Sequence, residues 1–194
     1  MTSSVASQVA PVDVDKAVSV VALAFSADPI CRWAYPDPDR YYRYFPPFIR
    51  AFAGAAFEVG TAYVTDDYSG AALWLPPGVH GDEEALLAII DESIPAELQG
   101  PLFEMVEQQA ESHPDRPHWY LPMIGVDPVH QGKGVGSRLL ERALAICDAE
   151  GLPAYLESTS PGSRKLYERH GFEVVREIQV ADSPPMWPMI REPR

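Results

Sequence analysis

Residues 130–137, which read HQGKGVGS, bring together the features that proteins use to hold a pyrophosphate. They follow an apolar run at 119–126 and open an amphipathic segment at 134–150. A strand, a glycine loop and a helix N-terminus in this order leave backbone N–H groups free, and the helix dipole helps them bind an anion. Lys133, Arg138 and Arg142 add cations on or near the loop. We therefore expect a phosphate-bearing ligand here.

Two familiar phosphate-binding patterns fit this loop poorly. A Walker P-loop needs a glycine, four further residues and then Gly-Lys-Ser/Thr, and no such string occurs. A dinucleotide fold needs Gly-x-Gly-x-x-Gly directly after a strand; Gly132 and Gly134 fit, but Ser137 takes the place of the third glycine. Glu157 in the next predicted strand would imitate the ribose-binding acid of that fold. Too little chain follows to complete a doubly wound sheet, so the dinucleotide fold stays only as a rival.

A third pattern, Gln-x-x-Gly-x-Gly, is carried by Gln131, Gly134 and Gly136. Together with GVDP at 125–128 and LYERHGF at 166–172, it resembles the acetyl-CoA signature of the GNAT superfamily of N-acetyltransferases. Within that superfamily, residues 155–159 and 186–189 resemble puromycin N-acetyltransferase and its relatives. The resemblance implies that an acetyl group passes from acetyl-CoA to the amine of a small molecule by direct attack in a ternary complex.

The resemblance also assigns the contacts to coenzyme A, most of them from backbone groups. The expected cofactor-binding residues are Ile124, Gly125, Val126, Gln131, Gly132, Lys133, Gly134, Val135, Gly136, Ser137 and Ser163. The three strand residues would bond the pantetheine arm, and one N–H among them would polarise the thioester carbonyl. Ser163 stands where the superfamily commonly has Asn, so it either contacts coenzyme A or serves mainly as a helix cap.

Two side chains are expected to move protons in such a transfer. Tyr167 matches the tyrosine that gives a proton to the departing thiolate. Many members of the superfamily carry the general base on the strand that 119–126 matches, but this run contains no acid. Glu157 on the next strand is the expected base, with a purely structural carboxylate as the alternative. His118, just before the first of these strands, is a weaker candidate.

The acceptor pocket is expected in an aromatic stretch near the amino terminus, with Trp33, Tyr35, Tyr41 and Tyr42 as candidate lining residues. Half or more of them can equally belong to the core. The net charge of -13 suits a cationic acceptor and argues against nucleic-acid binding. A coenzyme A-binding regulatory domain with weak or no activity is the alternative function, since the strand acid and the usual Asn are missing.

The order of elements predicts a mixed α/β protein. The expected helices cover residues 13 or 15 to 27, 47–57, 82–92, 97–112, 134–150 and 163–170, and the expected strands cover 61–65, 71–75, 119–126, 154–159, 172–180 and 186–190. Pro122 should leave its strand bulged or unpaired, because proline cannot donate a ladder hydrogen bond. By resemblance, the chain is a GNAT fold whose central mixed sheet is splayed like a V and flanked by helices.

Composition sets the remaining expectations. A chain of 194 residues, 46% of them hydrophobic, fits a single domain over 1–194. Cys31 and Cys147 lie far apart without metal-type spacing, and we expect no metal. Without a signal-like amino terminus or an apolar run of roughly 18 residues, the protein is expected to be cytoplasmic, with no membrane partner. A homodimer is an expectation from the superfamily alone.

Overall fold

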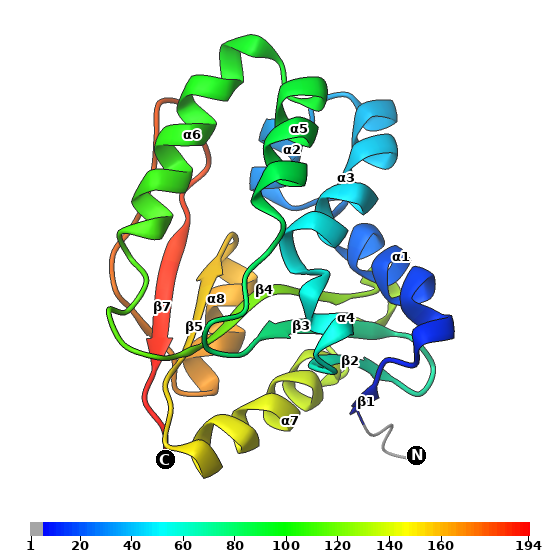
Figure 1. Ribbon diagram of the computed structural model, residues 1–194, viewed down its shortest axis with the longest axis vertical. Helices are drawn as coiled ribbons and strands as arrows, with labels where there is room; N and C mark the ends of the chain where they lie inside the picture. The colour runs from blue at the N-terminus through cyan, green and yellow to red at the C-terminus, as the bar shows by residue number, and fades with distance from the viewer. Residues whose placement is uncertain (1–5) are drawn as a thin grey trace.

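The computed structural model describes residues 6–194 and is built around one mixed sheet (Figure 1). The strands are β1 (Ala6–Gln8), β2 (Ala62–Thr65), β3 (Gly70–Leu75), β4 (Trp119–Val126), β5 (Ala154–Ser158), β6 (Glu173–Val174) and β7 (Trp187–Arg191). They lie in the order β1-β2-β3-β4-β5-β7-β6, and only β4 and β5 pair in parallel. The predicted mixed α/β architecture is confirmed.

Helices cover both faces of the sheet. On one side lie α1 (Val14–Phe25), α2 (Pro29–Ala34), α3 (Pro38–Ala53), α4 (Ala55–Glu58) and α5 (Glu83–Ser93), which share a hydrophobic cluster with β2 and β3. On the other side, α7 (Val135–Glu150) and α8 (Pro161–Arg169) pack a second cluster against β4 and β5. Short 3-10 turns at Pro11–Asp13 and Pro128–His130 precede α1 and the glycine loop.

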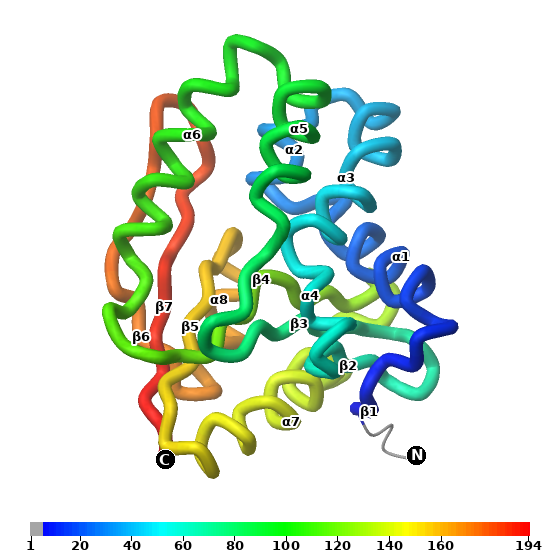
Figure 2. Tube along the Cα trace, viewed as in Figure 1, coloured from blue at the N-terminus to red at the C-terminus, as the bar shows by residue number. Residues whose placement is uncertain are grey.

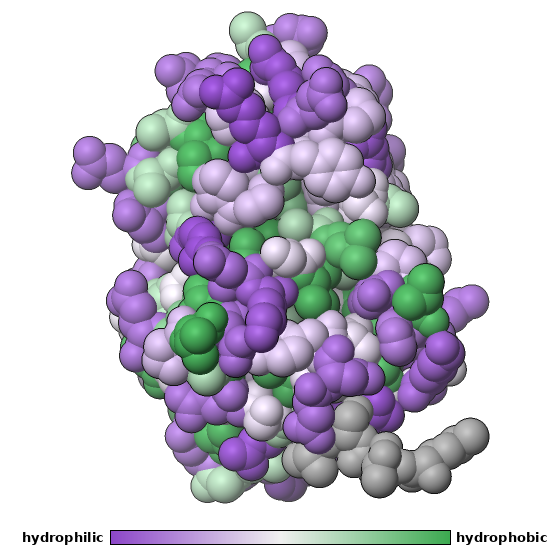
Figure 3. All heavy atoms as spheres, turned by 90° about the vertical axis from the view of Figure 1, so that its right-hand side faces the viewer, coloured by the Kyte–Doolittle hydropathy of each residue, from purple (hydrophilic) through white to green (hydrophobic). Residues whose placement is uncertain are grey.

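The helix α6 (Ala96–Ala110) lies along the C-terminal segment, as the trace in Figure 2 shows. Met105 of α6 shares a small buried cluster with Ile178, Val180 and Met186. Seen from the side of α1, hydrophobic residues are exposed in the middle of the molecule, among mostly polar ones (Figure 3). No helix in the described part of the chain is long and apolar enough to cross a membrane.

The predicted irregularity at Pro122 is a β-bulge. Leu73 pairs with Met123 and Leu75 pairs with Tyr120, so two β4 residues stand opposite Trp74 alone. The extra residue reverses the alternation of the strand: Leu121 packs on the α7 side, whereas Met123 packs in the α1–α3 cluster. A proline tolerates this position because the bulge requires no ladder N–H from it.

Beyond the bulge, β4 and β5 separate. Their parallel pairing spans Trp119 to Leu121 and ends where Leu121 meets Leu156. From there β4 continues with β3 as far as Val126, while β5 continues with β7 as far as Ser158. The sheet is therefore open between the far ends of its two central strands, as the V-shaped expectation requires.

The aromatic stretch near the amino terminus differs from its prediction. A helix was expected only from residue 47, but α3 already begins at Pro38, and α2 precedes it. Both helices open with a proline at the first turn, where no N–H is needed, and with an aspartate cap, Asp28 or Asp37. Four rings spaced along α3 contact one another in sequence at centroid distances of 4.8 to 5.7 Å, two pairs stacked and one tilted, and such contacts stabilise the helix.

Other predicted elements agree with the structure to within a few residues, with two exceptions. The strand expected over 172–180 is reduced to the two residues of β6, and β1 was not predicted. A three-residue strand carries too short an alternation to be recognised in a sequence.

Gly125 lets α1 approach β4 closely, and this packing can be tested. A Cβ at Gly125 would lie 2.7 Å from Cβ of Ala24, closer than real contacts allow, and 3.1 Å from Cα of Val21, which is tighter than most. We expect Gly125→Ala to lower the free energy of unfolding by about 1–3 kcal/mol in urea denaturation. Gly162→Ala, at an open position in α8, serves as the control and should be neutral or slightly stabilising. Equal stability of both variants would contradict this packing.

Candidate active site

The glycine loop has the backbone geometry that an anion-binding turn needs. Gly132 and Gly134 have φ values of 72° and 78°, in the left-handed region that favours glycine. Gly134 is the N-cap of α7 and no side chain caps the helix, so the first-turn N–H groups keep their capacity to donate. Around the loop, Gln131 donates from Nε2 to the carbonyl of Val126 at 3.3 Å, and Lys133 donates to that of Val129 at 2.9 Å.

Small residues bring the loop close to its neighbours. A Cβ on Gly136 would lie 2.9 Å from Cδ2 of Leu166, so this glycine lets α7 and α8 approach each other. The hydroxyl of Ser137 lies 3.0 Å from Nε2 of His170. What Ser137 offers a ligand is therefore its backbone N–H, like the other expected residues of the loop.

Ser163 is engaged in a cluster of serines at the start of α8. Its hydroxyl lies 2.8 Å from that of Ser158 and 2.9 Å from that of Ser160, and it also bonds the carbonyl of Ser160 at 3.0 Å. The helix cap itself is Ser160, which accepts from the N–H of Ser163. The expectation that Ser163 itself caps the helix is therefore wrong, and its contact with coenzyme A stays a prediction.

Tyr167 projects from α8 into the cluster on the α7 side of the sheet and is only 6% exposed. Its ring packs on Phe172 at a centroid distance of 6.0 Å. Within the described part of the chain its hydroxyl makes no hydrogen bond. Burial raises the pKa of this phenol well above its ordinary value of 10, and the charges of Asp28 and Glu157 raise it further. Tyr167 is therefore a protonated donor at neutral pH.

Asp28 is an acid beside Tyr167 whose position the sequence reasoning missed. Its Oδ1 accepts from the N–H groups of Ile30 and Cys31 at 3.0 and 3.1 Å, and its Oδ2 accepts from the hydroxyl of Thr159. Burial raises the pKa of this carboxyl. The contacts show that Asp28 caps α2 and ties it to the end of β5.

Glu157 lies on the opposite face of the sheet from Tyr167. Its side chain is 6% exposed, and Oε2 accepts a hydrogen bond from the hydroxyl of Tyr120 at 2.9 Å. The buried Oε1 has no hydrogen-bond partner and lies 3.5 Å from Nε2 of His113. A buried carboxylate oxygen without a donor is costly, so Oε1 is the atom that would accept a hydrogen bond from the N–H group of a ligand.

A cavity of about 610 Å³ opens beside Glu157. Its walls come from α3, the segment after β3, α5, the end of α6 and the start of β4. Apolar lining residues include Phe52, Pro76, Leu86, Val106 and Tyr120. The polar lining residues include His80, His113, Arg116, His118 and Glu157. The cavity can hold a largely apolar small molecule and present one polar group of it to Glu157.

The four aromatic residues expected to line the acceptor pocket do not line this cavity. Tyr35 and Tyr41 are buried in the core, where their hydroxyls bond Ser93 and the carbonyl of Ala22. Trp33 donates to Asp182 at 3.3 Å, and Tyr42 is 63% exposed. A helix runs through this stretch, so successive aromatic side chains point to the core and to the solvent by turns. Phe52 and Tyr120 line the cavity instead, and the alternation of the β4 run was the signal available for Tyr120.

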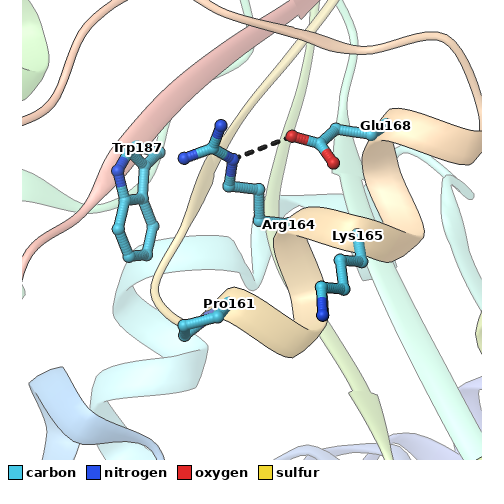
Figure 4. A pocket seen from close by; sticks show the side chains of 5 residues that line it. All are labelled: Pro161, Arg164, Lys165, Glu168 and Trp187. Atoms are coloured by element: carbon cyan, nitrogen blue, oxygen red, sulfur yellow. Dashed lines mark hydrogen bonds and ion pairs between the residues drawn. The ribbon is translucent and has the colours of Figure 1, made fainter.

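A second, smaller cavity of about 300 Å³ lies between α8 and β7 (Figure 4). Arg164 lies over the ring of Trp187 at 5.6 Å and pairs with Glu168 at 2.8 Å, while Lys165 points away from them. These charged groups are partly exposed and satisfy one another. The residues that line this cavity therefore form an ion pair and a cation–π contact at the surface, and we do not assign it as a second catalytic centre.

Comparison with known proteins places the chain in a family of acetyltransferases. Residues 28–172 match the model of the acetyltransferase (GNAT) family. An uncharacterized N-acetyltransferase of Schizosaccharomyces pombe is 28% identical over 198 residues, which cover 93% of this chain and 80% of that protein.

Two solved structures share the fold. A Corynebacterium glutamicum protein described as histone acetyltransferase HPA2 and related acetyltransferase superposes with a TM-score of 0.72 at 26% identity, covering 100% of this chain and 98% of that one. Arylalkylamine N-acetyltransferase 2 of Aedes aegypti gives a TM-score of 0.67 at 15% identity, covering 97% and 98%. With the family model matching most of its length, the chain belongs to the GNAT family of N-acetyltransferases.

Proposed function

We propose that this protein transfers the acetyl group of acetyl-CoA to the amine of a small molecule by direct attack in a ternary complex. The observation that carries the proposal is the position of two opposed groups at the opening between β4 and β5. Tyr167 approaches from the α7 side and Glu157 from the α3 side, yet the charge of Glu157 still affects the pKa of the Tyr167 hydroxyl. An acid and a base on either side of one opening suit a reaction in which one partner loses a proton and the other gains one.

The backbone supports binding of coenzyme A. The left-handed Gly132 and Gly134 and the uncapped start of α7 suit the pyrophosphate, with N–H groups from Gly132 through Ser137 as donors. Residues Ile124 to Val126 lie beyond the last pair that β4 makes with β5, so their β5-facing edge has no strand partner there and suits the pantetheine arm. The carbonyl of Val126 is the exception, because it already accepts from Gln131. When bound there, acetyl-CoA would supply the activated acetyl thioester.

The residues then divide the proton chemistry between them. Glu157 takes the proton of the amine on Oε1, the oxygen that lacks a donor. Tyr167 gives its phenolic proton to the departing sulfur, and its raised pKa keeps that proton available throughout the neutral range. Asp28 is the less suitable base, because both of its oxygens already accept hydrogen bonds.

The acceptor is proposed to be a small amine with an apolar body, bound in the cavity next to Glu157. The apolar lining of that cavity and the acidic carboxylate at its end support this class. The net charge of -13 favours the approach of a cationic amine. The arylalkylamine enzyme of Aedes aegypti and the resemblance of residues 155–159 to puromycin N-acetyltransferases suggest acceptors to try.

The alternative function, a coenzyme A-binding domain without activity, has two features in its favour. No acid lies on β4, and Ser163 is engaged with other serines. The donor state of Tyr167 and the unpartnered oxygen of Glu157 favour catalysis, because a binding module would need neither.

A panel of amines tests this choice. We expect the protein to release thiol from acetyl-CoA in the presence of at least one arylalkylamine, polyamine, aminoglycoside or puromycin. Isothermal titration should detect coenzyme A and not NAD. Binding of coenzyme A without turnover on any of these amines would favour the regulatory domain. Binding of NAD alone would instead revive the dinucleotide fold.

The role of the glycine loop gives a second prediction, with a matched control at the other end of α7. Gly134 and Gly151 are both left-handed, at φ values of 78° and 67°, and neither would place a Cβ in a clash. An alanine at either position costs roughly 1–2 kcal/mol of backbone strain. We expect Gly134→Ala to raise the Kd for coenzyme A by about tenfold, because relief of that strain turns the N–H groups away from the pyrophosphate.

Gly151→Ala should lose similar stability and keep the affinity, measured for both variants by isothermal titration. Equal Kd values for the two variants would show that coenzyme A does not bind on this loop.

A further inference from the structure

The unpartnered oxygen of Glu157 stands at the end of a chain of two histidines. His118 places Nδ1 2.8 Å from the backbone carbonyl of Arg116 and Nε2 3.1 Å from Nδ1 of His113. His113 in turn places Nε2 3.5 Å from Oε1 of Glu157. Both histidines lie between α6 and β4 and line the cavity proposed for the acceptor.

The chemistry of each atom decides which group donates and which accepts along this series of hydrogen bonds. A carbonyl oxygen only accepts, so His118 must carry a proton on Nδ1. Burial lowers the pKa of His118 below its ordinary value of 6.5, so at neutral pH its Nε2 is a lone pair that accepts. His113 must then donate through Nδ1. A neutral His113 therefore turns the lone pair of its Nε2 toward Glu157.

Two acceptors thus face each other across the gap between His113 and Glu157 when neither is protonated. A single proton in that gap satisfies both atoms, whichever of the two holds it. The ring of His113 cannot easily turn away, since it packs against Tyr155 at 4.2 Å and Tyr120 at 4.8 Å between centroids.

The charged groups around this pair leave it without a cation of its own. Tyr120, Tyr155 and His118 contact this pair, and Arg116 lines the same cavity. Arg176 affects the pKa of Tyr155, and Glu157 affects the pKa of Tyr167 from the opposite face of the sheet. Arg116 pairs with Glu192, and Arg176 pairs with Glu111 at 3.5 Å. Within the described part of the chain, no Lys or Arg forms an ion pair with Glu157.

We propose that Glu157 and His113 form a proton-holding pair that takes up the proton of the acceptor amine, and that His118 positions it by fixing the tautomer of His113. The proposal rests on the acetyl transfer proposed above. The amine attacks in its neutral form, after a bound ammonium has given one proton to water. As its nitrogen bonds to the acetyl carbon and the carbon–sulfur bond breaks, the second amine proton passes into the gap between Oε1 and Nε2. Tyr167 gives one proton to sulfur. The pair later releases its proton to water through His113, whose side chain is 30% exposed, and Tyr167 regains one, so the protons balance.

The dependence of kcat/KM on pH tests this assignment. In His118→Phe, His113 loses its acceptor and is free to carry its proton on Nε2, where it donates to an ionised Glu157. We expect the midpoint of the acidic limb to fall by about one pH unit, because a hydrogen bond to a carboxylate is worth roughly that much. The plateau should drop about tenfold, since the base is weaker.

Two control variants separate this effect from a general disturbance. His118→Gln offers an amide oxygen to His113 and an amide N–H to the carbonyl of Arg116. The midpoint of its acidic limb should therefore lie close to the wild-type value. His80→Phe changes a histidine that lines the same cavity outside the chain and should leave the midpoint in place. A midpoint unchanged in His118→Phe, or shifted equally in His80→Phe, would overturn the proposal.

Nitrogen-15 spectra of the free protein give a readout that does not depend on turnover. In the wild type, His113 should be protonated on Nδ1 at neutral pH, and in His118→Phe the proton should move to Nε2. If no amine is acetylated but the tautomer moves, the proposed function fails while the hydrogen-bonded chain stands. If amines are acetylated but His113 keeps the same tautomer in both proteins, the proposal that His118 positions the proton-holding pair is refuted.

Discussion

β4 stops pairing with β5 after Leu121, and every part of the candidate site is positioned by that break. The bulge opposite Trp74 consists of Leu121 and Pro122, so it begins at the same residue and reverses the faces of β4. The reversal puts Met123 on the α1 side, while Tyr120 before the bulge also faces that side and reaches Glu157. The unpaired edge beyond the bulge is where backbone N–H and C=O groups become available to a ligand. The loss of pairing between β4 and β5 thus creates both the unpaired edge of β4 that can bind a ligand and the opening between Tyr167 and Glu157.

Close packing around the break keeps its geometry in place. Gly125 lets α1 lie against β4, and Gly136 lets α7 approach α8. Asp28 then ties the start of α2 to Thr159 just after β5. Because these contacts come from segments far apart in the sequence, the opening is a property of the whole sheet rather than of one loop. Catalysis depends on holding reacting groups in a fixed orientation, and this packing supports that requirement.

The sequence predicted the part of the site that is local. Glycines at fixed spacing, a strand before them and a helix after them are recognisable along the chain, so the loop at 130–137 and the helix of Tyr167 were found. The proline at 122 foretold the bulge because its missing N–H is a local property. The mixed sheet followed from the order of elements, whereas the edge strand β1 was too short to be seen.

What the sequence could not show was which distant side chains meet. His113 and His118 are separated from Glu157 by 44 and 39 positions, and only the fold of the segment between α6 and β4 brings them to it. The aromatic residues at 33–42 were expected to line a pocket, but helices α2 and α3 bury Tyr35 and Tyr41. Asp28 was visible as a helix boundary; its contact with Thr159 depends on tertiary packing.

The rate of acetyl transfer by Glu157→Gln and by Tyr167→Phe, measured over a range of pH on one active amine, tests the account most directly. Glutamine keeps the size of the side chain but cannot take a proton, and phenylalanine removes only the phenolic hydroxyl. The account predicts that each variant loses about 100-fold or more in kcat with an unchanged Kd for coenzyme A. Wild-type turnover in both variants would contradict the account. A complete loss of activity in Asp28→Asn together with unchanged activity in Glu157→Gln would contradict it as well.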